Sequence, residues 1–317
     1  MSPRKKKIYP VRQQGAALRV YNIDELYRLI VNNLTLSDLL QYREVSKVHE
    51  AEVYSIFRSR IIKYTAPFFA TTESRVLFFD ALHTYGSLIV GSVSLAVLSM
   101  PSSPEAPNNL NVLATFVHYQ SWLDTMLQKL KYTIHAQGPC VGPYAIAGYR
   151  HVTFAHPDTD AKITLTFSNR SHVWELLFCA PKSCQWNAIG SGTIICPTVE
   201  ATSRCEAVMG WWNRDHMYSL DDESVPGVSN TSPFPDIVTV YEDTGGWDRP
   251  CGLLCPGRPR YTFGGRGIGV WGWTGLNGGM AVNNDLVSEL ITTNYRWDLG
   301  DRCLNPNCTA NSVQPEA

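Results

Sequence analysis

Apolar positions recur with a helical period near the start of the chain. The first stripe follows a pairing of Asn22 with Glu25 that is typical of a helix N-terminus. Its members are Leu26, Leu29, Ile30 and Leu34. A second stripe follows a predicted capping box at Thr35 and Asp38. Its members are Leu39, Leu40, Val45 and Val48, and a third helical run from Ser46 to Tyr64 completes a predicted three-helix module over residues 20–66.

This module is too small to be stable alone, because about 40 residues bury little apolar surface. We therefore expect its apolar face to contact the rest of the chain or a partner protein. Pro67 and the cluster Thr71-Thr72-Glu73 follow the third helix and indicate a boundary, with a second domain starting near Ser74.

From residue 74 to 220 the pattern changes to alternating strand-like and helical stretches, which predicts a mixed sheet with flanking helices. The expected helices cover residues 75–85, the stretch after Gly91-Ser92, and residues 120–132, 173–178 and 203–218. The expected strands cover residues 110–117 and 193–196, and a hairpin is expected at 151–167. The predicted fold class is α+β.

The last third of the chain has a different composition. Residues 221–236 are rich in Asp, Ser, Pro, Gly and Asn and predict a mobile loop. Residues 237–309 are rich in Gly, Trp and Cys, which predicts a separate C-terminal module.

Charge and composition narrow the classes of function. The chain has 317 residues, 44% of them hydrophobic, and a formal net charge of −1. A near-neutral protein has no overall field that attracts nucleic acid or an anionic membrane, so neither partner is expected. The basic run Arg4-Lys5-Lys6-Lys7 predicts a disordered tail over residues 1–19, with a nuclear-import or phosphate-binding signal as the alternative.

Targeting signals are not visible in the sequence. Gln13, Gln14 and Gly15 follow the charged start where a signal peptide has apolar residues, and the apolar run from Leu88 to Met100 is too short to span a bilayer. The expected location is therefore cytoplasmic or nuclear. In that setting the nine cysteines predict reduced thiols or metal ligands and not a disulfide framework.

The N-terminal module resembles the F-box, the helical motif by which substrate receptors bind the Skp subunit of cullin-based ubiquitin ligases. The resemblance runs from Glu25-Leu26 to Val45-Ser46-Lys47 without a gap, with Asn22-Ile23 in place of the usual Leu-Pro pair. It implies Skp contacts by Leu26, Leu29, Ile30, Leu34, Leu39, Leu40 and Val45. An ordinary helical hairpin that docks within the chain is the alternative.

Residues 76–212 resemble the minimal nucleotidyltransferase fold. The resemblance implies that the Gly91-Ser92 turn holds a triphosphate and that an acid-x-acid pair on the next strand binds metal. Here that pair falls on Asn109 and Asn111, and the later strand carries threonine where a third carboxylate is usual. Because Mg²⁺ is held by anionic oxygens, we expect a degenerate nucleotide site without catalysis. An active transferase is the alternative.

Four cysteines near the end of the chain form two pairs. They are Cys251 and Cys255, and Cys303 and Cys308. Their spacings are close to those of structural zinc sites, which predicts one structural zinc ion, with free buried thiols as the alternative.

The Gly-rich stretch 264–279 favours tight turns around aromatics, because no Lys-Ser/Thr pair of a phosphate loop follows it. The sequence has no Gly-x-Ser-x-Gly nucleophile elbow, so no motif of this kind indicates a hydrolase.

The F-box-like opening, the degenerate body and the cysteine-rich end together resemble a group of fungal F-box proteins of unassigned substrate. The implied function is a non-catalytic recognition subunit of a cullin-type ubiquitin ligase. Its expected partners are Skp and an unidentified protein substrate. The alternatives are a nucleotide-modifying transferase and a structural interaction protein.

Overall fold

The computed structural model describes residues 23–98, 107–158, 161–180, 183–203, 206–208, 238–240, 260–261, 269–273 and 296–297. Contacts divide the chain into two compact units, Met1–Leu34 and Thr35–Ala317. The predicted basic tail, the predicted loop at 221–236 and most of the predicted C-terminal module lie outside the described residues.

The first unit contains one described helix, α2 (Asp24–Asn32). It begins one residue later than the sequence predicted, with Ile23 and not Asn22 at the N-cap. Because isoleucine has no polar side chain, this end of the helix lacks a side-chain cap. At the other end the Asn33 side-chain amide donates to the Leu29 carbonyl over 2.7 Å.

Two capped helices open the second unit. The predicted capping box at Thr35 is confirmed: its hydroxyl accepts from the Asp38 backbone N–H over 3.1 Å, and its own N–H donates to the Asp38 carboxylate over 3.2 Å. This box starts α3 (Leu36–Arg43), and Ser46 then caps α4 (Lys47–Thr65). Both predicted helices are therefore present.

Buried side chains fix α3 and α4 to the sheet of the same unit. Leu36 and Leu39 of α3 are fully buried, as are Phe57 and Ile61 of α4. The Phe57 ring packs 5.8 Å from the Trp271 ring, which belongs to the sheet. The contacts thus group α3 and α4 with the α+β body.

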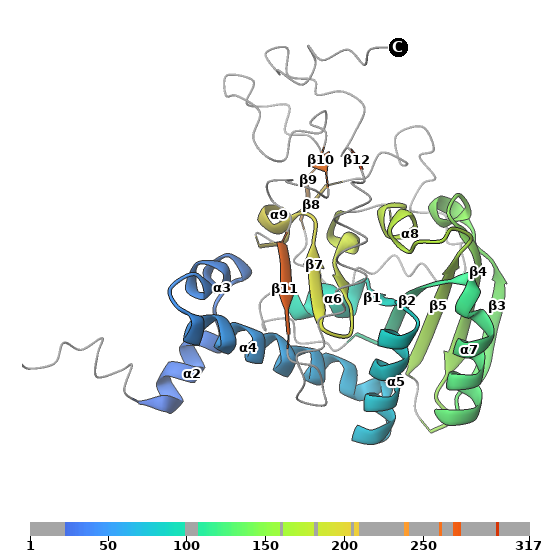
Figure 1. Ribbon diagram of the computed structural model, residues 1–317, viewed down its shortest axis with the longest axis horizontal. Helices are drawn as coiled ribbons and strands as arrows, with labels where there is room; N and C mark the ends of the chain where they lie inside the picture. The colour runs from blue at the N-terminus through green and yellow to red at the C-terminus, as the bar shows by residue number, and fades with distance from the viewer. Residues whose placement is uncertain are drawn as a thin grey trace, which may run out of the picture. The chain divides into compact units, whose positions relative to one another are not determined.

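The second unit is built on an eight-stranded mixed sheet (Figure 1). Its strands in spatial order are β11 (Gly269–Gly272), β7 (Thr193–Cys196), β6 (Ala188–Ile189), β1 (Leu88–Val90), β2 (Asn109–Thr115), β5 (Lys162–Ser168), β4 (Gly148–Ala155) and β3 (Thr133–Pro139). Neighbouring strands are antiparallel except β2 and β5, which are parallel. The predicted α+β class with a mixed sheet is confirmed.

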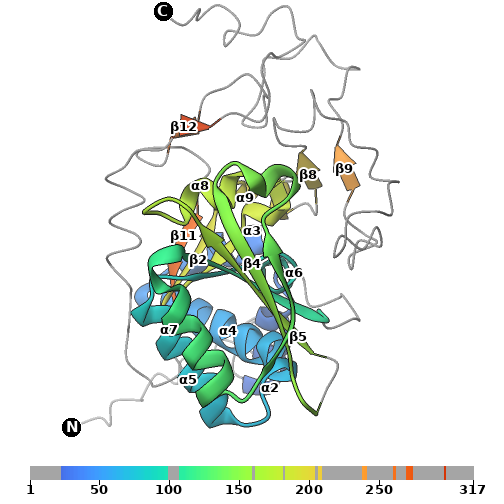
Figure 2. The same ribbon diagram turned by 90° about the vertical axis from the view of Figure 1, so that its right-hand side faces the viewer.

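Helices cover the sheet and connect its strands. They are α5 (Thr72–Thr84), α6 (Ser92–Leu98), α7 (Tyr119–Asp124), α8 (Trp174–Phe178) and α9 (Val199–Ser203). Short turns of helix are η1 (Ala66–Phe68), η2 (Phe116–His118), the π-helical η3 (Thr125–Lys129), η4 (Gly142–Ala145) and η5 (Ser183–Trp186). Figure 2 shows α5 beside α7, where the Phe78 and Trp122 rings lie 5.5 Å apart.

The two faces of the sheet differ. On one face Val112, Leu165 and Phe154 are fully buried, and Tyr119 of α7 packs its ring 5.0 Å from Phe167. On the other face α8 packs over β1 and the end of β2 in a cluster that includes Leu88, Val90, Leu113, Trp174 and Leu176. The strands beyond that cluster carry polar residues on this second face.

Several local predictions are confirmed and one is wrong. Helix α5, the turn at Gly91-Ser92 and the hairpin of β4 and β5 lie where the sequence placed them. The helix predicted for 203–218 is wrong in its described part, because Glu206–Val208 is a strand, β8, paired in parallel with β9 (Val238–Val240). Pairing with a strand distant in the chain, Glu206 with Val238, overrode the local helical pattern. A further small sheet joins β10 (Arg260–Tyr261) to β12 (Arg296–Trp297).

Across the described ranges, no helix combines the length and the apolar character needed to cross a bilayer.

A matched pair of leucine variants tests the packing of the N-terminal helices. Leu39→Ala removes a fully buried side chain and is expected to lower the free energy of unfolding by about 2–5 kcal/mol. Leu29→Ala removes a side chain that is 61% exposed, and its effect is expected to stay within about 0.5 kcal/mol. Urea denaturation of both variants measures the difference, and equal small losses would show that α3 is not part of the core.

Candidate functional site

The described residues include a polar, partly exposed surface on the sheet, which we call the polar sheet face. Its members are Asn109, Asn111, His151, Thr153, Lys162, Thr164 and Thr166. Strand register places Asn111 of β2 beside Thr164 of β5, and Thr164 beside Thr153 of β4. Residues directly opposite each other share a face, so these side chains form rows across the strands.

The Gly91-Ser92 turn lies at one border of this face. Gly91 ends β1 with a φ of +74°, and its carbonyl accepts from the Ser94 hydroxyl over 2.9 Å and from the Leu95 N–H over 3.0 Å. A Cβ atom at Gly91 would lie 3.0 Å from Asn111 Nδ2. Glycine is therefore required both for the backbone angle and for the close approach of the Asn111 amide.

The predicted neighbours of this turn lie where the sequence placed them. Asn109 and Asn111 are both on β2, and the Ser92 hydroxyl donates to Asn109 Oδ1 over 3.4 Å. The structure thus brings Gly91, Ser92, Asn109 and Asn111 together.

The polar sheet face offers neutral groups in place of the carboxylates of a metal site. Thr153 and Thr164 share a hydrogen bond of 3.1 Å between their hydroxyls, next to Asn111. Amides and hydroxyls donate and accept hydrogen bonds but hold Mg²⁺ weakly. Within the described ranges, no group of three or more His, Cys, Asp and Glu side chains is arranged to hold a metal ion.

A lysine and a histidine border the face on its far side. Lys162 lies beside Asn109 in register, and its Nζ is 3.4 Å from Nε2 of His135 on β3. His135 sits where the register of β3 shifts between Ile134 and Ala136. Sequence reasoning missed this pair, because strand β3 has no alternating pattern and a register shift leaves no local signal.

His151 completes the face on β4. Its Nδ1 lies 3.1 Å from the Pro139 carbonyl of β3, and its ring packs over Gly138, where a Cβ atom would be 3.3 Å from Cε1. The carbonyl accepts only, so Nδ1 carries the proton in this hydrogen bond and Nε2 is left to face other groups.

The residues predicted to contact Skp fall into two groups. Leu26, Leu29 and Ile30 of α2 are 42%, 61% and 52% exposed, and Val45, between α3 and α4, is 67% exposed. Leu39 is fully buried, and Leu34 and Leu40 are half-buried. Leu39 is therefore a core residue in this structure and is not available to a partner.

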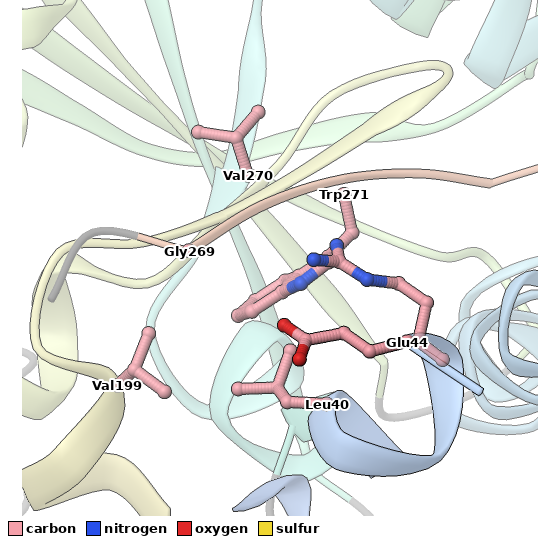
Figure 3. A pocket seen from close by; sticks show the side chains of 7 residues that line it. Leu40, Glu44, Val199, Gly269, Val270 and Trp271 are labelled. Carbon is pink, nitrogen blue, oxygen red and sulfur yellow. The ribbon is translucent and has the colours of Figure 1, made fainter. Parts of the chain in front are cut away.

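Leu40 lines a shallow pocket of about 280 Å³ between α3, α9 and β11 (Figure 3). Val199, Gly269 and Trp271 also line it, together with the oppositely charged Arg43 and Glu44. Figure 3 shows the Leu40 and Glu44 side chains turned toward the Trp271 indole. One cation and one anion side by side favour no particular charge of ligand.

The described cysteines are not activated. Burial raises the pKa of Cys140 and of Cys179 to about 11 and that of Cys196 to about 12. These thiols stay protonated at neutral pH and are poor nucleophiles. The predicted zinc ligands Cys251, Cys255, Cys303 and Cys308 lie outside the described residues, so that site stays a prediction.

One serine and histidine pair was not foreseen. His83 Nδ1 lies 3.0 Å from the Ser191 hydroxyl, in the tight turn between β6 and β7. The Trp273 indole N–H donates to the Gly190 carbonyl in the same turn over 3.1 Å. The hydrogen bond between His83 and Ser191 connects this turn to α5. Because Ser191 is only 7% exposed, its hydroxyl is poorly accessible to a substrate.

No protein-family model, curated protein or solved structure matches this chain. Function therefore has to be argued from the residues themselves. Two surfaces are candidates: the exposed apolar side of α2 and the polar sheet face.

Glycine variants test the contact between the Gly91 turn and Asn111. Gly142 also has a positive φ, +58°, but nothing lies within 4 Å of a Cβ atom there. Gly142→Ala is expected to lower the free energy of unfolding by about 1–2 kcal/mol, through backbone strain alone. Gly91→Ala is expected to lower it further, because its methyl group displaces the Asn111 amide.

Thermal or urea unfolding provides the measurement, with a double variant as the control. Asn111→Ala removes the crowding, so the added cost of Gly91→Ala in that background should fall to the Gly142→Ala value. Equal losses for Gly91→Ala in both backgrounds would contradict the contact.

Proposed function

We propose that this protein is a non-catalytic recognition subunit that binds the Skp subunit of a cullin-type ubiquitin ligase through α2 and presents its α+β body to a substrate or ligand. The exposure of Leu26, Leu29 and Ile30 on one side of a nine-residue helix carries the proposal. Large apolar side chains that gather on one exposed surface are typical of interaction sites.

The chemistry of α2 suits a helix that binds in a groove. Such helices lay an apolar side into a complementary groove and use anchors spaced three and four residues apart. Leu26, Leu29 and Ile30 have that spacing, and they belong to the stretch that resembles the F-box. The burial of Leu39 removes it from the proposed contact set, which is smaller than the sequence alone suggested.

For the body we propose a degenerate nucleotidyltransferase-like architecture. The order α5, β1, Gly91-Ser92, α6, β2 supports it, as does the parallel pairing of β2 with β5. The non-catalytic assignment depends on residue type: Asn109, Asn111 and Thr164 are neutral where carboxylates would hold Mg²⁺. The same substitution disfavours the alternative of an active nucleotide-modifying transferase.

A structural interaction protein, whose helices dock within the chain, is the second candidate. The burial of Leu36, Leu39 and Phe57 favours it, because α3 and α4 use their apolar sides inside the body. The two candidates differ in the role of α2, whose exposed side chains serve a partner only in the first.

Skp binding by variants of the full chain separates these candidates. The double variant Leu29→Lys with Ile30→Lys replaces two exposed apolar side chains by lysine. Lysine has a high helix propensity, and its positive charge is favourable near the C-terminus of a helix, so α2 should stay folded. Val117→Lys, at a residue in η2 that is 80% exposed, is the matched control. Calorimetry with recombinant Skp should show an affinity loss of about 100-fold or more for the double variant and less than about twofold for the control.

Two results would overturn the proposal. Wild-type protein that does not bind Skp would remove the ligase assignment and favour the structural candidate. Double-variant protein that binds Skp as tightly as wild type would show that α2 is not the contact.

A further inference from the structure

The strand registers define the polar sheet face as a grid. One row across β2, β5, β4 and β3 is Asn109, Lys162, Ala155 and Thr133. The next row is Asn111, Thr164, Thr153 and Ala136, and the third is Leu113, Thr166, His151 and Gly138, with Leu113 buried in the cluster that α8 covers. Strands about 4.8 Å apart and rows about 6.7 Å apart make a face about 14 Å on each side, which suits a small molecule.

Lys162 is the one Lys, Arg, Asp or Glu residue in the three rows of this grid. Lys162 is exposed on β5 with His135 of β3 beside it, and His151 lies on β4 two rows away, opposite Thr166. None of the three rows contains Asp or Glu. Arg150 is directed elsewhere, since its guanidinium donates to the Tyr119 hydroxyl over 3.2 Å beside the buried face. The grid therefore has the electrostatics of an anion site and not of a metal site.

The register shift in β3 supplies an independent observation. Thr133 pairs with Ala155 and Ala136 with Thr153, so β3 has one residue more than β4 across this stretch. The extra residue is His135, whose Nε2 lies 3.4 Å from Lys162 Nζ. Bulges that redirect a side chain are over-represented at functional sites. Here the bulge brings an imidazole next to Lys162. The ammonium can only donate, so Nε2 of His135 accepts in this contact, while the other N–H groups of Lys162 and Nδ1–H of His135 can donate to an anion.

We infer that Lys162 and His135 bind the phosphate group of a phosphorylated small molecule directly, without a metal ion. The neighbouring amides and hydroxyls of Asn109, Asn111 and Thr164 then hydrogen-bond to the hydroxyl or amide groups of the ligand's body. The preferred class is a phosphate ester of a polyol or nucleoside. This site goes beyond the docking of α2 and does not depend on it.

Calorimetry on the full chain in the presence of EDTA tests the site. The probes are inorganic phosphate, ribose 5-phosphate and adenosine 5′-monophosphate. Both esters are expected to bind more tightly than inorganic phosphate, because only they reach the amides and hydroxyls of the grid. The two esters distinguish a sugar-phosphate ligand from a nucleotide.

Charge variants provide the controls. Lys162→Gln and His135→Gln are each expected to weaken ester binding by about tenfold or more, while Lys162→Arg retains it. Lys63→Gln, which removes a lysine from the exposed surface of α4, should change affinity by less than about twofold. Thr164→Val should reduce the advantage of the esters over inorganic phosphate and leave phosphate binding unchanged.

Three outcomes would overturn the inference. The first is an absence of binding by every probe in EDTA. The second is ester binding that is unchanged in Lys162→Gln. The third is binding that requires added Mg²⁺, which would point to a metal-bridged nucleotide instead. All five substitutions change exposed or half-buried side chains, and an unchanged melting temperature will show that each variant is folded.

Discussion

The parallel pairing of β2 with β5 is the constraint on which the candidate site depends. A parallel neighbour cannot follow through a short turn, so the chain must cross over between the two strands. The crossover here contains α7 and the strands β3 and β4, and it delivers β4 and β3 to the far side of β5. The register of this one pair sets Asn109 beside Lys162 and Asn111 beside Thr164. The composition of the polar sheet face follows directly from it.

Burial on the same face then decides how much of the sheet is available. Helix α8 packs its tryptophan and leucines over Leu88, Val90 and Leu113, which closes the part of the face nearest β1. The rows that begin at Asn109 and Asn111 extend past that cluster, with Asn109 and Lys162 exposed and Asn111 and Thr164 half-buried. Along β2, side chains point alternately to the two faces of the sheet. Asn109, Asn111 and Leu113 lie on the face of the candidate site, and Leu110 and Val112 are buried on the opposite face.

Local signals explain which features the sequence could predict. The capping box at Thr35, the Gly91-Ser92 turn and the β4–β5 hairpin depend on residues a few positions apart, and all three are present. The bulge at His135, strand β8 and the contact of His83 with Ser191 depend on partners distant in the chain. Helical spacing alone also could not distinguish Leu39, which is buried, from Leu29, which is exposed. The spacing shows that apolar side chains share one side of a helix, but not which other element packs against that side.

Electrostatics links the neutral residues at the turn to the cations on the far strands. A face that held Mg²⁺ through carboxylates on β2 would place those carboxylates next to Lys162, because position 109 lies opposite that lysine. An ion pair across the two strands would then compete with the metal for the same oxygens. With Asn109 in place no such competition exists, and Lys162 and His135 keep their capacity for an external anion. The neutral side chain at position 109 and the absence of an ion pair between Asn109 and Lys162 are therefore two aspects of one distribution of charge.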